Sequence, residues 1–124
     1  MNVVDSSGWL EFFADGPSAA VFAGPIRKLR ELIVPTVSIY EVFKRVLQQR
    51  DENQALQAAA LMQQGVVVEL NSTLALSAAK LSVDLNLPMA DSVMLATARA
   101  HDAVLWTQDA DFEGIEGVRY VPAR

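Results

Sequence analysis

The chain has 124 residues, of which 52% are hydrophobic and 20% are charged, and its net charge is −5. This composition predicts one globular domain over residues 1–124 and excludes a disordered chain. With no cysteine and a single histidine, the sequence also excludes disulfides, thiolate metal sites and multi-histidine metal sites.

Five short runs of apolar residues predict strands, in chain order at residues 3–4, 32–34, 66–68, 104–106 and 118–121. Periodicity and composition predict helices at residues 7–14, 18–23, 36–50, 53–64, 72–85 and 91–101, with a break at Gly16-Pro17. Continuous apolar runs are typical of parallel strands buried on both faces. The alternation predicts a three-layer α/β/α fold, in which a mainly parallel sheet of about five short strands has helices on both faces.

The sequence shows no targeting signal or membrane segment. Its first residues, Met-Asn-Val-Val-Asp, contain neither a basic segment nor a long apolar run. The uncharged stretch at residues 53–68 carries five Asn or Gln residues, which does not favour a membrane span. We therefore expect a cytoplasmic protein that does not contact a membrane.

Five carboxylates fall at positions that this fold would bring to one edge of the sheet. Asp5 directly follows the first strand, and Asp109 and Asp111 follow the fourth. Glu41 lies in the first turns of the helix that leaves the second strand, and Asp91 opens the helix that leads into the fourth. Ligands bind beyond the carboxyl ends of parallel strands, so this edge is the candidate site.

Such a cluster persists only if its carboxylates are protonated, paired with bases or bound to cations. No Lys or Arg lies within these motifs. Oxygen ligands without His or Cys favour Mg²⁺ or Mn²⁺, which act mainly on phosphates. The acidic net charge is then a weaker objection to a nucleic-acid substrate, because ten acids remain against ten bases once these five are set aside.

Each acid also has a purely structural interpretation. The acids after strands fit turn residues, and Asp91 fits a helix N-cap or first-turn acid. Ser38 and Glu41 have the spacing of a capping box. Lys44 and Arg45, beside Glu41, are interpreted as a solvated face rather than an RNA track. The functional interpretation therefore depends on the conjunction of all five acids at one edge.

Four segments resemble the motifs of the PIN-domain family, in the same order and along nearly the whole chain. They are Val3-Val4-Asp5-Ser6-Ser7, residues 34–42 (VPTVSIYEV), residues 87–92 (LPMADS) and residues 105–112 (LWTQDADF). For a domain of this size, the resemblance implies a VapC-type toxin of a toxin–antitoxin pair. It implies a Mg²⁺- or Mn²⁺-dependent endoribonuclease that acts on RNA, is neutralised by a small cognate antitoxin and forms a homodimer.

The same resemblance implies the roles of single residues. The family's four acids correspond to Asp5, Glu41, Asp91 and Asp109 as catalytic residues. Asp5, Asp91 and Asp109 would bind the metal. Supporting roles fall to Thr107, to Asp111, which could share the role of Asp109, and to Ser7 or Ser6. Where the family often has Thr after the first Asp, this chain has two serines, which keep a hydroxyl group there.

Two other functions are weighed against this one. A catalytically weak or inactive PIN-fold module could bind an antitoxin or a second copy of itself through Trp9, Phe12 and Phe13. Phosphoryl transfer to an aspartate is disfavoured, because Asp5 is followed by serines rather than by a second acid and no lysine clearly follows a strand.

Overall fold

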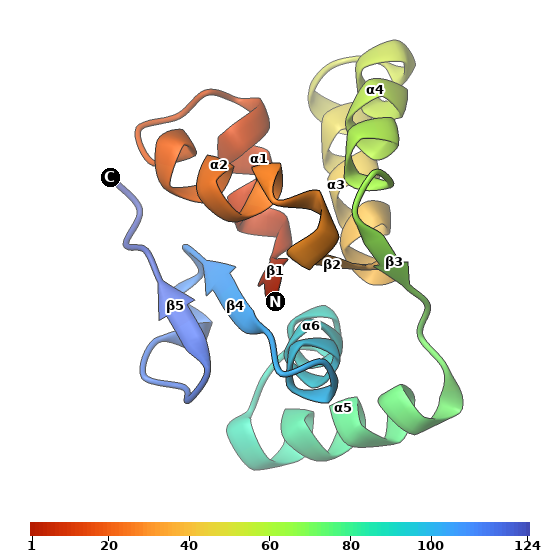
Figure 1. The fold of residues 1–124 in the computed structure, drawn as a ribbon, viewed down its shortest axis with the longest axis vertical. Coiled ribbons are helices and arrows are strands. Elements are labelled where there is room, and N and C mark those ends of the chain that lie inside the picture. Colours follow the sequence, from red (N-terminus) through yellow and green to blue (C-terminus); the bar gives the residue numbers. More distant parts are fainter.

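The molecule is built around a five-stranded sheet in which every strand pair is parallel (Figure 1). In the computed structural model, which describes residues 1–124, the strands are β1 (Asn2–Val4), β2 (Leu32–Pro35), β3 (Val66–Val68), β4 (Val104–Thr107) and β5 (Val118–Tyr120). Their spatial order is β3-β2-β1-β4-β5. The predicted fold is confirmed, and each predicted strand agrees with an observed one to within one residue at each end.

Six helices cover the two faces of the sheet. They are α1 (Ser6–Phe13), α2 (Ala19–Arg27), α3 (Thr36–Gln49), α4 (Glu52–Met62), α5 (Ser72–Leu85) and α6 (Met89–Ala100). Figure 1 shows α1 to α4 on one side of the sheet and α5 and α6 on the other. Two short 3-10 helices, η1 (Leu29–Glu31) and η2 (Ala110–Phe112), precede β2 and follow β4. None of the helices combines the length and apolar character that crossing a bilayer would require.

The central strand β1 is packed on both of its faces because successive side chains of a strand point in opposite directions. Val3 packs with Met94 and Leu95 of α6, and Val4 packs with Trp9 of α1 and Phe22 of α2. The core therefore has two layers, one on each side of the sheet, and β1 is held rigidly between them.

The strand order places a topological switch point at the carboxyl ends of β1 and β4. From β1 the chain passes to β2 and β3 on one side, and then returns to β4 on the other side of β1. Connections therefore leave β1 and β4 in opposite directions, which is the arrangement that opens a binding crevice in parallel sheets. Asp5 and Thr107 lie at the two sides of this point.

Two predicted helix boundaries are wrong. The helix predicted at residues 18–23 runs from Ala19 to Arg27 and contains Pro25. Pro25 has no N–H to donate to the carbonyl of Val21, but Phe22 and Ile26 are buried in the core on either side of it, and this packing keeps the turn helical. Helix α6 begins at Met89, so Asp91 lies within its first turn.

The aromatic segment of α1 belongs mainly to the core. Trp9 is only 1% exposed and stacks on Phe13, with ring centroids 5.7 Å apart. The proposal that Trp9 contacts a partner is therefore wrong, because its surface is already used for packing. Phe12 and Phe13 remain partly exposed.

Candidate active site

Asp5 is a buried carboxylate that is held on both of its oxygens. Oδ1 accepts hydrogen bonds from the Ser7 hydroxyl at 2.7 Å and from the Gly8 amide at 3.0 Å. Oδ2 accepts a hydrogen bond from the Thr107 hydroxyl at 2.6 Å. Burial raises the pKa of Asp5 to about 6, against the lowering effect of these three donors, and the charge of Asp109 adds to the rise. The carboxylate is thus fixed in direction at the crevice.

Gly8 allows α1 to begin so close to the sheet. A Cβ atom at this position would lie 2.7 Å from both the Phe22 ring and Val4 Cγ1. Any larger residue would push the first turn of α1 away and would separate the residue 8 amide from the Asp5 carboxylate that caps the helix. The sequence analysis did not identify Gly8, although a glycine three residues after a strand-terminal aspartate was the available signal.

Two hydroxyl groups join the end of β1 to the end of β4. The Thr107 hydroxyl, besides donating to Asp5, accepts a hydrogen bond from the Asp109 amide at 2.9 Å. The Ser7 hydroxyl accepts one from the Gln108 amide at 3.1 Å. The backbone that carries Asp109 is therefore positioned by the same groups that orient Asp5.

Asp91, Asp109 and Asp111 bring their carboxylates together from α6 and from the segment after β4. One oxygen of each lies within 4.8 Å of one oxygen of each of the others. Partial burial raises the pKa of Asp91 to about 7, and the next causes are the charges of four neighbours. In decreasing order these are Asp109, Asp5, Glu41 and Asp111. Asp91 is thus the carboxylate on which the repulsion of the whole cluster converges.

Glu41 reaches the site from α3 and is held by Ser6. Its Oε1 accepts a hydrogen bond from the Ser6 hydroxyl at 2.5 Å. The capping box expected for Ser38 and Glu41 is wrong, because α3 begins at Thr36 and the Ser38 hydroxyl donates to the Pro35 carbonyl instead. The Ser6 contact spans 35 positions of sequence and had no local signal.

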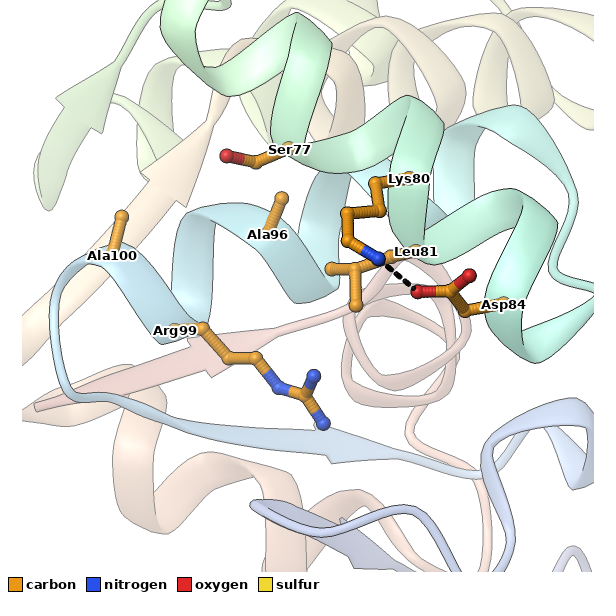
Figure 2. Close-up of a pocket in the computed structure, with 7 residues that line it drawn as sticks. All are labelled: Ser77, Lys80, Leu81, Asp84, Ala96, Arg99 and Ala100. Atoms are coloured by element: carbon orange, nitrogen blue, oxygen red, sulfur yellow. Dashed lines mark hydrogen bonds and ion pairs between the residues drawn. The ribbon is translucent and has the colours of Figure 1, made fainter.

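The structure therefore brings together all five acids that the sequence analysis selected, with Ser7 and Thr107 among them. No basic side chain neutralises them, because the one ion pair of the structure joins Lys80 and Asp84 on α5. That pair lies in a hollow of about 400 Å³ between α5 and α6, beside Arg99 (Figure 2). This hollow shares no residue with the carboxylate cluster.

The donor set fits a hard divalent cation. All the ligand atoms are carboxylate oxygens, and their spacing of up to 4.8 Å is close to the separation of about 4 Å between opposite oxygens around Mg²⁺. A bound cation would remove the repulsion that raises the pKa of Asp91. Asp91, Asp109 and Asp111 are the residues best placed to hold it, with Asp5 at the neighbouring strand end.

Comparison with known proteins places this geometry in a family. The sequence pattern of the PIN domain matches residues 3–118. A toxin–antitoxin complex from Klebsiella pneumoniae has a similar structure, with a TM-score of 0.81 and 19% identity over 99% of this chain and 100% of the other. The toxin VapC20 from Mycobacterium tuberculosis, described as cleaving the sarcin–ricin loop, has a TM-score of 0.79 and 17% identity, covering 100% and 99%.

A third similar structure is VapBC2 from Rickettsia felis bound to a DNA fragment from its promoter. It has a TM-score of 0.74 and 12% identity over 98% of this chain and 97% of the other. At these identities the structural likeness shows the fold alone, and no curated protein sequence matches the chain significantly. The family assignment depends on the sequence pattern, which covers most of the chain. The chain belongs to the PIN-domain family.

Proposed function

We propose that this chain is a metal-dependent endoribonuclease and the toxin of a toxin–antitoxin pair, acting as one domain over residues 1–124. The observation that carries the proposal is the cluster of five carboxylates at the crevice, with no base to neutralise them. Nucleases are the enzymes that such a site suits, because divalent cations held by carboxylates act on phosphodiesters. The similar structures include a toxin–antitoxin complex and the toxin VapC20.

In this proposal Asp5, Asp91 and Asp109 hold Mg²⁺ or Mn²⁺, and Asp111 contributes from the same group. The bound cation would supply charge neutralisation at the phosphate and a water of lowered pKa. Thr107 and Ser7 keep the Asp5 carboxylate turned toward the crevice. With a pKa of about 7, Asp91 is partly protonated near neutral pH, and a cation bound there would compete with that proton.

Glu41 has a different assignment. It is not part of the group of three whose oxygens lie closest together, but its charge contributes to the raised pKa of Asp91. We assign it to orienting the attacking water, with Ser6 fixing its carboxylate. RNA would be the substrate, and cleavage would leave 5′-phosphate and 3′-hydroxyl ends.

The proposed partners follow from the similar structures, of which several are complexes of a toxin with its antitoxin. We propose a small antitoxin as the protein partner, a homodimer as the assembly and the cytoplasm as the location. Co-purification with the product of a short neighbouring gene, and loss of RNA cleavage in that complex, would support the toxin role.

The test of the catalytic proposal is cleavage of a structured RNA by the purified chain, with Mg²⁺, with Mn²⁺ and with EDTA. We expect cleavage with the metals only, and its loss in Asp5→Ala and Asp91→Asn variants that keep their circular dichroism spectrum. Asp84→Asn, which removes an exposed acid on α5 away from the cluster, is the matched control and should cleave normally. Full activity of Asp91→Asn would overturn the assignment. Absence of both cleavage and a Mn²⁺-dependent thermal shift in the parent would leave a non-catalytic binding module.

A further inference from the structure

The exposed face of α3 continues directly from the candidate active site. A hollow of about 360 Å³ on this face is lined by Tyr40, Glu41, Lys44, Arg45 and Gln48. Residues four positions apart on a helix are neighbours on its surface, so Lys44 follows Tyr40 and Arg45 follows Glu41 along the helix. Glu41 belongs to both places, since its charge also acts on Asp91. Whatever occupies this hollow therefore lies next to the carboxylate cluster.

The two basic groups in the hollow are free cations. Neither Lys44 nor Arg45 forms an ion pair, because the one ion pair of the structure joins Lys80 and Asp84. Both side chains are exposed. On α3, Lys44 and Arg45 outnumber the single acid, Glu41. The chain is thus acidic as a whole but has a locally positive surface beside its most acidic site.

Tyr40 adds an aromatic surface to these cations. Its side chain is 63% exposed, which is unusual for a ring that the core could bury. Lys44 Nζ lies 5.8 Å from the ring centroid, so a positive charge and a flat apolar surface are presented together. Proteins that hold single-stranded nucleic acids use this combination, in which bases stack on aromatic rings and cations contact the phosphates.

We infer that this face of α3 holds a single-stranded segment of RNA next to the scissile phosphate, with one base stacked on Tyr40 and with Lys44 and Arg45 contacting the backbone. The inference rests on the proposed ribonuclease function and adds the substrate surface to it. A polyanion entering a cluster of five carboxylates is repelled, and cations within one helical turn of Glu41 offset that repulsion. A duplex does not fit the same role, because the faces of its bases are covered by neighbouring bases.

Binding is tested with the Asp91→Asn chain and a short fluorescein-labelled single-stranded RNA, followed by fluorescence anisotropy at several salt concentrations. Each phosphate contact to a single strand contributes about 0.7 to the slope of log K against log salt. Replacing Lys44 and Arg45 together with Gln should therefore lower this slope by about 1.4. The matched control replaces Lys28 and Arg30 with Gln, which are exposed and lie before β2, at the opposite edge of the sheet. The control should leave the slope unchanged, and equal slopes in both double variants would overturn the inference.

The stacking contact is tested separately at Tyr40. Tyr40→Ala should weaken RNA binding by at least about 5-fold, the smallest effect seen when a stacking ring is removed. Tyr40→Phe keeps the ring and should bind RNA as the parent does. If neither variant changes RNA binding while Tyr40→Ala weakens binding of a co-purified protein partner, this face is a protein-docking surface and the inference is wrong.

Cleavage kinetics separate failure of this inference from failure of the proposed function. In a chain that cleaves RNA, the Lys44 and Arg45 replacement should raise KM and leave kcat within about 2-fold, since uniform binding is what it removes. Unchanged KM with active enzyme would reject the RNA surface and keep the ribonuclease. A parent chain that cleaves no RNA with either metal would reject the ribonuclease, and the anisotropy slopes would still decide whether α3 binds RNA.

Discussion

Aspartates occur in two regions of this molecule with opposite surroundings. Asp84 lies at the surface of α5, where its carboxylate accepts a hydrogen bond from Lys80 Nζ at 2.8 Å (Figure 2). This bond and the charge of Asp84 raise the pKa of Lys80. Asp91, in the first turn of α6, is half-buried among four other carboxylates and has no basic partner. Asp84 thus has a cationic partner on its own helix, whereas Asp91 has no cationic partner anywhere in the chain.

The two aspartates differ in what their negative charge costs the folded chain. Exposed pairs one helical turn apart contribute little to stability, because water solvates both partners almost as well. Half-buried carboxylates that face one another destabilise the folded chain at neutral pH, because each ionises against the field of the others. In the proposed function, a bound cation would relieve this repulsion.

The largest effect on Mn²⁺ binding is expected within the carboxylate cluster, where replacements of Asp109 and Asp111 can be compared. Both have an oxygen close to Asp91, but Asp109 is half-buried and positioned by Thr107, whereas Asp111 is exposed. We expect Asp109→Asn to weaken Mn²⁺ binding by about 100-fold or more and Asp111→Asn by about 10-fold, by analogy with the range for supporting groups of metal sites. Isothermal titration calorimetry at pH 7.5 measures both. Equal losses would show that the two carboxylates share one role.

The next largest effect on Mn²⁺ binding is expected from replacing Thr107. Thr107→Val removes the hydroxyl that donates to Asp5 Oδ2, so the pKa of Asp5 should rise above about 6. Protons then compete better for that carboxylate, and Mn²⁺ affinity at pH 7 should fall by about 10- to 100-fold. The pH dependence of Mn²⁺ binding should also shift upward in this variant. Thr107→Ser keeps the hydroxyl and is the control, and identical curves for Val and Ser would contradict the assigned role.

The sheet and the positions of the acids on it could be predicted from the sequence, because short periodic patterns indicate the strands and helices. The apolar run that became β2 (Leu32–Pro35) is buried along its whole length, as a central parallel strand should be, and parallel strands send their carboxyl ends to one edge. Asp5 directly follows β1 and Asp109 lies two residues after β4, so adjacent parallel strands bring them near each other. Predicting that these acids lie at one edge of the sheet required only that the strands be parallel, and the alternation of strands and helices along the chain indicates that.

The contacts that orient those acids could not be predicted. The Thr107 hydroxyl reaches Asp5 across 102 positions and the Ser6 hydroxyl reaches Glu41 across 35, and neither spacing has a local signature. Ser38 illustrates the reverse case, since its spacing to Glu41 satisfies the capping-box pattern. The helix begins two residues earlier, at Thr36, and that sets Ser38 against the backbone instead. Local motifs fail wherever the packing of two distant segments decides the geometry.

The stability of the metal-free chain should depend on pH through Asp91. Its pKa is about 7 in the folded chain and near 3.8 without that environment, so between these values the folded chain binds more protons. Stability is therefore lost as the pH rises from about 4 to about 7. Asp91→Asn removes the charge and should be more stable than the parent at pH 8 by about 2 kcal/mol, after allowing for solvent screening of a half-exposed group.

Urea unfolding with EDTA, at several pH values from 4 to 8, measures that difference. The advantage of Asp91→Asn should shrink steadily as the pH falls toward 4, where the folded parent is protonated at Asp91 and the unfolded parent, with a pKa near 3.8, is partly protonated. Added Mn²⁺ should reverse the order at pH 8 by stabilising the parent more than the variant. If the stability difference between Asp91→Asn and the parent were the same at every pH, it would arise from packing at position 91 and not from the charge of Asp91.

The smallest effect is expected at the exposed pair on α5. Lys80→Ala and Asp84→Asn should each leave Tm within about 2 °C of the parent and leave Mn²⁺ binding unchanged, since both partners are well solvated when separated. Differential scanning fluorimetry, with and without Mn²⁺, measures both quantities in the same samples. A loss of Mn²⁺ binding in either variant would contradict this expectation, because it would show that the exposed pair on α5 acts on the carboxylate cluster. A null result at Asp84 beside a large one at Asp91 would instead show that surroundings, and not the presence of a carboxylate, decide which aspartates of this chain serve the metal.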